Sequence, residues 1–117
     1  MFVVTIILVV LLALAFAMSG GLKVAGAKSA MDQADHFGIA HDRYKIIGAL
    51  ELLAVIGMLG GLAVWPLGVA AGAGLVLVMV GAVIVHIRTG DKVAHFAPAI
   101  VLGALAAAEV VFRALSA

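Results

Sequence analysis

Four long apolar runs fill most of this chain, and they leave few folds open to it. The runs are Val3–Leu22, Ile46–Val64, Leu67–Ile87 and Ala97–Leu115. Each approaches the roughly 20 residues that an α-helix needs to cross the hydrocarbon core of a membrane. Backbone groups in lipid must be hydrogen-bonded internally, so helices are the expected spanning form. We therefore predict an all-α integral membrane protein, with residues 1–117 forming one domain, a four-helix transmembrane bundle.

The composition excludes several functional classes. Hydrophobic residues make up 67% of the chain, charged residues only 11%, and the mean hydropathy is +1.35. These values lie far outside the composition of soluble globular proteins. Cysteine is absent, so disulfides, thiolate catalysis and cysteine-ligated metal centres are excluded. The net charge is close to neutral and no basic run is dense, so nucleic acid is not an expected partner.

The positive charges lie almost entirely between the first and second runs or between the third and fourth. Cytoplasmic loops of membrane proteins carry an excess of Lys and Arg, so both segments are predicted to face the cytoplasm and both termini the outside. The first run is predicted to be a retained helix rather than a signal peptide, because basic residues follow it at once. Six of the seven basic residues are in these two segments: Lys23, Lys28, Arg43, Lys45, Arg88 and Lys92.

The segment Lys23–Lys45 is the only substantial polar stretch, and it shows a helical pattern. Ser29 is a candidate N-cap with Asp32 three residues later, and Gly38 is a candidate stop. A short interfacial helix fits this pattern, and a disordered loop is the alternative. Three residues at helical spacing would share one apolar face: Met31, Ala34 and Phe37.

Small residues mark the expected helix contacts. A tight turn at Trp65-Pro66 predicts that the second and third runs form an antiparallel hairpin. Small residues at a spacing of four allow two helix backbones to approach closely in a membrane. Packing within the bundle is the favoured interpretation, and a homo-oligomer is the alternative. The glycines in question are Gly57, Gly61, Gly68 and Gly72.

Glu51 is the most informative polar residue. It lies six positions after Lys45, about 9 Å into the span, where an ionised carboxylate is costly without a partner. Ser19, Lys23 and His86 approach the same predicted side of the membrane, so they form a candidate site with Glu51. The cluster could bind the polar headgroup of a quinone or lipid, move a proton, or serve as an ion pair that fixes helix register.

The remaining polar residues carry weaker predictions. Glu109 and Arg113 are four apart in the favourable order and are expected to pair near the outer boundary. Asp91 and Lys92 are expected in a solvated turn. Four histidines fall on the predicted cytoplasmic side, but none has ligand spacing, so no metal or haem site is expected. These are His36, His41, His86 and His95.

With these residues in view, the chain resembles the DoxX-like family of small four-helix membrane proteins. The resemblance rests on the end of the first run, Phe16–Lys23, on Ile47–Glu51 where the family tends to carry Gly-x-x-Glu, on a Gly-rich third run, and on Pro98 near the start of the fourth run. It implies that Ser19, Gly20, Lys23, Gly48 and Glu51 are family-pattern residues, without giving any of them a catalytic role.

The family takes its name from a membrane subunit of a thiosulfate:quinone oxidoreductase, and other members look like partners in membrane-associated redox complexes. The sequence and the resemblance together predict a non-catalytic membrane subunit or anchor with a protein partner, in which quinone is a possible cofactor. A small proton-coupled transporter and a structural or assembly accessory are the alternatives. The Ala-, Gly- and Val-rich composition fits a GC-rich bacterium, and the expected location is the bacterial inner membrane.

Overall fold

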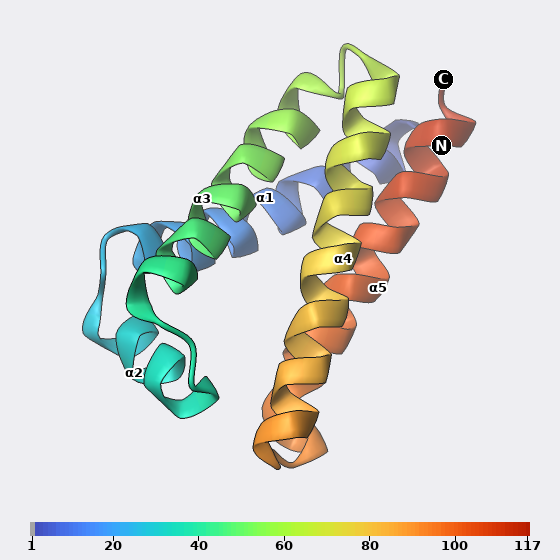
Figure 1. The fold of residues 1–117 in the computed structure, drawn as a ribbon. Helices are drawn as coiled ribbons and strands as arrows, with labels where there is room; N and C mark the ends of the chain where they lie inside the picture. Colours follow the sequence, from blue (N-terminus) through green and yellow to red (C-terminus); the bar gives the residue numbers. More distant parts are fainter. Residues whose placement is uncertain (1) are drawn as a thin grey trace.

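The computed structural model describes residues 2–117, which form five α-helices (Figure 1). The fold is therefore all-α, as predicted. The helices are α1 (Phe2–Val24), α2 (Lys28–Phe37), α3 (His41–Gly60), α4 (Trp65–Thr89) and α5 (Val93–Leu115).

The four long helices form two pairs. α1 packs along α3 and α4 packs along α5, while α3 contacts α4 and α1 contacts α5. Both chain ends and the α3–α4 turn lie at one end of the molecule, and the short α2 lies at the other (Figure 1). A buried apolar cluster joins the pairs at mid-height: Val9, Leu12, Phe16, Val55, Met58, Leu75, Met79 and Ala106.

Three of the helices, α1, α4 and α5, are long and apolar enough to cross a membrane. Their outer faces carry many exposed Leu, Ile and Val side chains, a pattern that fits contact with lipid. α3 is 20 residues long but does not meet the same criterion, because Asp42, Arg43, Lys45 and Glu51 all fall within it. The three apolar helices are the part of the predicted four-helix membrane bundle that the structure supports.

The predicted polar loop 23–45 is mostly helical. α1 continues to Val24, α3 begins already at His41, and the predicted short helix is present as α2. Gly38 ends α2 in a left-handed conformation (φ 69°), as expected for a glycine stop. The predicted cap is wrong: Ala27 occupies the N-cap position without a side-chain hydrogen bond, and Ser29 lies inside the helix.

Two other boundaries differ from the apolar runs. α3 ends at Gly60, and a short turn follows before α4 begins at Trp65, with Pro66 in its first turn. α5 begins at Val93, so Pro98 lies inside the helix rather than at its start. A helix can continue through polar residues that lie beyond the lipid, so apolar runs alone do not mark its ends.

Glycines occupy the closest helix contacts. A Cβ at Gly61 would lie 2.2 Å from the Gly68 Cα, and a Cβ at Gly48 would lie 2.9 Å from the Gly20 carbonyl oxygen. A Cβ at Gly57 would lie 3.0 Å from the Ala71 Cβ. These glycines lie against neighbouring helices of the same chain, so close approach of the backbones explains the choice of glycine here.

Candidate functional site

Lys23 and Glu51 form an ion pair where α1 meets α3. The Lys23 ammonium donates to the Glu51 carboxylate and also to the Ser19 hydroxyl, at 3.1 Å. Glu51 is completely buried, while the Lys23 side chain is 12% exposed. The second carboxylate oxygen of Glu51 has no hydrogen-bond partner among residues 2–117. The close approach of Gly20 and Gly48 brings these two helices near enough for the pair to form.

A cavity of about 500 Å³ opens beside this ion pair, between the α1–α3 pair and the α4–α5 pair. Ser19 and Lys23 line it from α1, and His86 and His95 line it from α4 and α5. Much of the remaining wall is apolar: Phe37, Ile39, Ile47, Leu50, Val78, Met79, Ala82, Val85, Pro98, Ala99 and Leu102. Glu51 does not line the cavity. Its contact with the site is the ion pair that holds the Lys23 ammonium in place.

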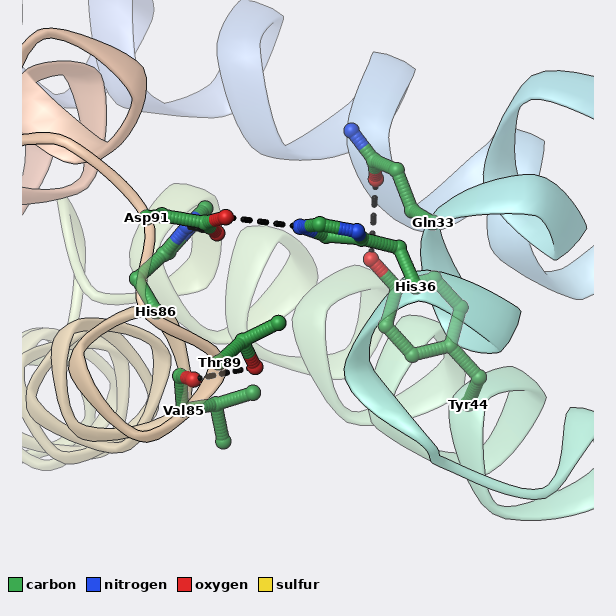
Figure 2. A network of polar contacts seen from close by, with 7 residues as sticks. All are labelled: Gln33, His36, Tyr44, Val85, His86, Thr89 and Asp91. Carbon is green, nitrogen blue, oxygen red and sulfur yellow. Dashed lines mark hydrogen bonds and ion pairs between the residues drawn. The ribbon is translucent and has the colours of Figure 1, made fainter.

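Tyr44 connects the ion pair to α2. The Lys23 ammonium lies 5.0 Å from the centre of the Tyr44 ring, a favourable cation–π arrangement. The Tyr44 hydroxyl donates to the Gln33 side-chain oxygen of α2 at 2.9 Å (Figure 2). Gln33 and Tyr44 both line the cavity. α2 is therefore fixed beside the site by a polar contact and by apolar packing against α3.

Asp91 links α2 to α4 on the other side of the cavity. Its two carboxylate oxygens accept hydrogen bonds from His36 Nε2 and from His86 Nδ1, both at 2.7 Å, and Figure 2 shows the bond to His36. The hydrogen bond from His36, with a further contribution from His86, holds the pKa of the Asp91 carboxyl below its ordinary value. The prediction of a solvated Asp91 is wrong, since its side chain is only 9% exposed.

This pKa shift gives a testable pH dependence. Because the pKa of Asp91 is lower in the folded protein, its contribution to stability is present above the unfolded pKa and is lost as the pH falls through the folded one. We expect wild type to be more stable to heat than Asp91→Asn at neutral pH, and the difference to shrink below about pH 4. Thermal unfolding in detergent across this range measures it.

The matched control for Asp91 is Asp35→Asn. Asp35 also accepts a hydrogen bond from a histidine, His41 at 2.7 Å, but both side chains are largely exposed. An exposed pair contributes little, so this variant should stay close to wild type at every pH. A difference between Asp91→Asn and wild type that does not change with pH would contradict the assignment.

A second buried polar cluster lies at the opposite end of the molecule. Arg113 Nε donates to the Gly61 carbonyl oxygen at 2.7 Å and thereby satisfies the end of α3, and its guanidinium lies 5.4 Å from the Phe2 ring centre. Glu109 is fully buried against Gly72, and neither of its oxygens has a hydrogen-bond partner in the described part of the chain. The expected Glu109–Arg113 ion pair is not formed; both residues instead pack between α5 and the α3–α4 hairpin.

The structure brings together three of the four predicted site residues. Ser19, Lys23 and Glu51 are in direct contact, and His86 lines the same cavity but is held by Asp91. Sequence reasoning missed Tyr44, Gln33 and Asp91. An acidic residue in a short connection between two helices is easily interpreted as solvated. Only the position of α2 shows that the His36 side chain reaches Asp91. Within residues 2–117, no group of three or more His, Asp or Glu side chains could hold a metal ion.

Comparison with known proteins identifies the family of this chain. The profile of the DoxX-like family matches residues 7–109, which include all of the Ser19–Lys23–Glu51 contacts. Searches for similar curated proteins and for similar solved structures gave no match. Three helices able to cross a membrane and the family match together indicate a multi-pass membrane protein. The chain belongs to the DoxX-like family.

Proposed function

We propose that this protein is a non-catalytic membrane subunit or anchor that binds the polar headgroup of a membrane-soluble molecule, with a quinone as the first candidate. The observation that carries the proposal is the cavity between the two helix pairs. Its volume of about 500 Å³ falls within the usual range for small-molecule sites. It combines a largely apolar wall with hydrogen-bond donors on two sides, and this combination suits a molecule with an apolar body and a polar end.

The donors match the oxygens of a quinone. The Lys23 ammonium has three N–H groups, of which two are donated to Ser19 and Glu51, so one remains for a ligand in the cavity that Lys23 lines. A quinone presents two carbonyl oxygens on opposite sides of its ring, and both are acceptors only. Lys23 on one wall and His95 on another could each donate to one of them. His86 Nδ1 is already engaged by Asp91, which orients its ring against Phe37 and Phe96.

This proposal includes a specific placement in the membrane. α3 is the proposed fourth span, because Ile46–Gly60 is apolar apart from Glu51, which Lys23 neutralises. α2 and the α4–α5 connection would face the cytoplasm, and both termini the outside, according to the distribution of Lys and Arg. The bacterial inner membrane fits the composition. A redox enzyme would be the protein partner, and α2 would provide the contact.

The alternatives have less support. A transporter needs a polar path across the membrane, but buried apolar residues fill the middle of the bundle between the two polar clusters. A structural accessory would use Lys23 and Glu51 only to lock the helices and would need no cavity. A homo-oligomer would need another surface, since the glycines Gly57, Gly61, Gly68 and Gly72 face helices of the same chain.

The first experiment is gentle detergent extraction of the tagged protein, followed by mass spectrometry of bound proteins and small molecules. A quinone at a fixed ratio, or a stoichiometric redox enzyme, would support the proposal. A protein that carries only bulk lipid would count against it and favour the structural alternative.

Substitution of Glu51 tests the site directly. We expect Glu51→Gln to leave the bundle folded, because the amide can still accept from Lys23, but to weaken binding of a short-chain benzoquinone about tenfold. The physical reason is that a neutral amide holds the ammonium less firmly. Equilibrium dialysis with protein in lipid nanodiscs measures the affinity.

Glu109→Gln is the matched control for this substitution, because it makes the same change at a fully buried carboxyl at the opposite end of the bundle. It should leave quinone affinity unchanged. Unchanged affinity in Glu51→Gln, or an equal loss in Glu109→Gln, would remove Glu51 from the proposed site.

A further inference from the structure

A second pocket, of about 440 Å³, is lined by two arginines from different helices. Arg43 belongs to the first turn of α3 and Arg88 to the last turn of α4. The rest of the lining comes from the end of α2 with its connection to α3, and from α4: Phe37, Gly38, Ile39, Val85 and Thr89. The Thr89 hydroxyl already donates to the Val85 carbonyl oxygen at 2.7 Å (Figure 2), so the arginines supply the remaining polar groups.

The two guanidinium groups have no counter-ion within the described chain. Neither arginine takes part in an ion pair or side-chain hydrogen bond among residues 2–117. The acidic residues that are close to them in sequence do not fill this role: Asp91 is engaged by two histidines, and the exposed Asp42 does not line the pocket. Both arginines are exposed, so their guanidinium groups are accessible to an anion that binds in this pocket.

In the membrane placement proposed above, the pocket lies at the level of the lipid phosphate groups. Arg88 directly follows the apolar run Leu67–Ile87, and Arg43 lies three residues before the run Ile46–Val64, so both sit at the edge of the apolar region. α3 also begins here without a side-chain cap, and free N–H groups at a helix start favour an anion. Phe37, Ile39 and Val85 give the pocket an apolar wall suited to the uncharged part of a lipid.

We propose that Arg43 and Arg88 form a binding site for the phosphate of an anionic phospholipid headgroup. Arginine is suited to this ligand because its planar guanidinium donates two parallel hydrogen bonds to phosphate oxygens. Arg43 and Arg88 line this pocket but not the Lys23 cavity. The two pockets share an apolar wall formed by Phe37, Ile39 and Val85. The same chemistry would bind a soluble phosphate ester, but the apolar wall and the position at the membrane edge favour the lipid.

The experiment compares protein in nanodiscs of phosphatidylcholine with and without phosphatidylglycerol. Native mass spectrometry after release measures how much phosphatidylglycerol stays bound. We expect wild type to retain phosphatidylglycerol selectively. Retention should fall about fivefold in Arg43→Gln or Arg88→Gln and about twenty-fold in the double variant. Circular dichroism and unchanged benzoquinone affinity would show that each variant is folded.

Two lysines provide controls of equal charge. Lys28 and Lys92 are exposed at the same end of the molecule but do not line the pocket, so Lys28→Gln and Lys92→Gln should retain phosphatidylglycerol like wild type. Equal losses in these controls, or no preference for phosphatidylglycerol, would overturn the proposal. Tight binding of glycerol phosphate to the detergent-solubilised protein would overturn the lipid assignment in favour of a soluble ester. Glu51→Gln should retain phosphatidylglycerol like wild type. Loss of quinone binding can therefore be distinguished from loss of lipid binding at Arg43 and Arg88.

Discussion

Replacing Gly61 by alanine is expected to destabilise the protein by about 3 kcal/mol or more. The new Cβ would lie 2.2 Å from the Gly68 Cα and 2.3 Å from the Gly68 nitrogen, and backbone atoms cannot move aside as the end of a side chain can. α3 and α4 would have to separate. Separation would also displace the Gly61 carbonyl oxygen from Arg113 and leave a buried guanidinium with one hydrogen bond fewer. Reversible unfolding in mixed micelles measures the change.

Gly74→Ala is the matched control for this substitution. Gly74 lies in α4, and a Cβ there would meet no described atom within 4 Å. Alanine is the better helix former by about 1 kcal/mol, so this variant should be as stable as wild type or slightly more stable. Equal destabilisation by the two substitutions would show that the close contact between Gly61 and Gly68 is not what limits stability.

Lys23→Met is expected to have a similarly large effect for an electrostatic reason. Methionine keeps most of the length and apolar contact of the lysine, but it leaves Glu51 fully buried without its partner. Breaking a buried ion pair in this way costs about 3–5 kcal/mol. The Ser19 hydroxyl and the Tyr44 ring would lose their contacts with the ammonium as well. Reversible unfolding in mixed micelles, as for Gly61→Ala, measures the loss of stability, so the two substitutions can be compared directly.

The double variant Lys23→Met/Glu51→Gln separates the cost of the unpaired charge from that of lost packing. Removing both charges leaves no ion stranded in the interior, so most of the stability should return even though the site is destroyed. If the free energy of unfolding of Lys23→Met is within about 1 kcal/mol of that of wild type, the Lys23–Glu51 pair contributes no more than an exposed ion pair. If the double variant is no better than Lys23→Met, packing and not charge accounts for the loss.

The sequence was sufficient for those features that depend on local chemistry. The apolar runs located the long helices, Gly38 marked the end of α2, and the cost of burying Glu51 led to Lys23 as its partner. An isolated carboxylate in an apolar run needs a cation nearby, and few cations were within reach. Ser19 and Lys23 are four positions apart, so helical spacing places them on one face of α1, where their side chains are hydrogen-bonded.

Features that depend on how separate segments meet could not be derived in this way. The bond between His36 and Asp91 joins residues 55 positions apart, and it requires α2 to lie against the α4–α5 connection. Arg113 had two candidate partners, Glu109 on its own helix and the buried Gly61 carbonyl oxygen at the end of α3, and it binds the second. Helical spacing predicted the local pair, whereas the tertiary contact satisfied a backbone group that would otherwise be buried without a partner.

The contact between Gly61 and Gly68 gives the molecule a mechanical property as well as a packing contact. α4 continues about 32 Å from Gly68 to its end at Thr89 (21 residues at about 1.5 Å each). A small change in the helix angle at Gly68 therefore displaces the far end of α4 by a larger distance. A rotation of about 5° there would move the far end by about 3 Å over such a length. Any change in the angle between α3 and α4 at this crossing would therefore have its largest effect near His86 and Arg88. Both proposed binding sites lie at the end of the molecule where such motions are largest.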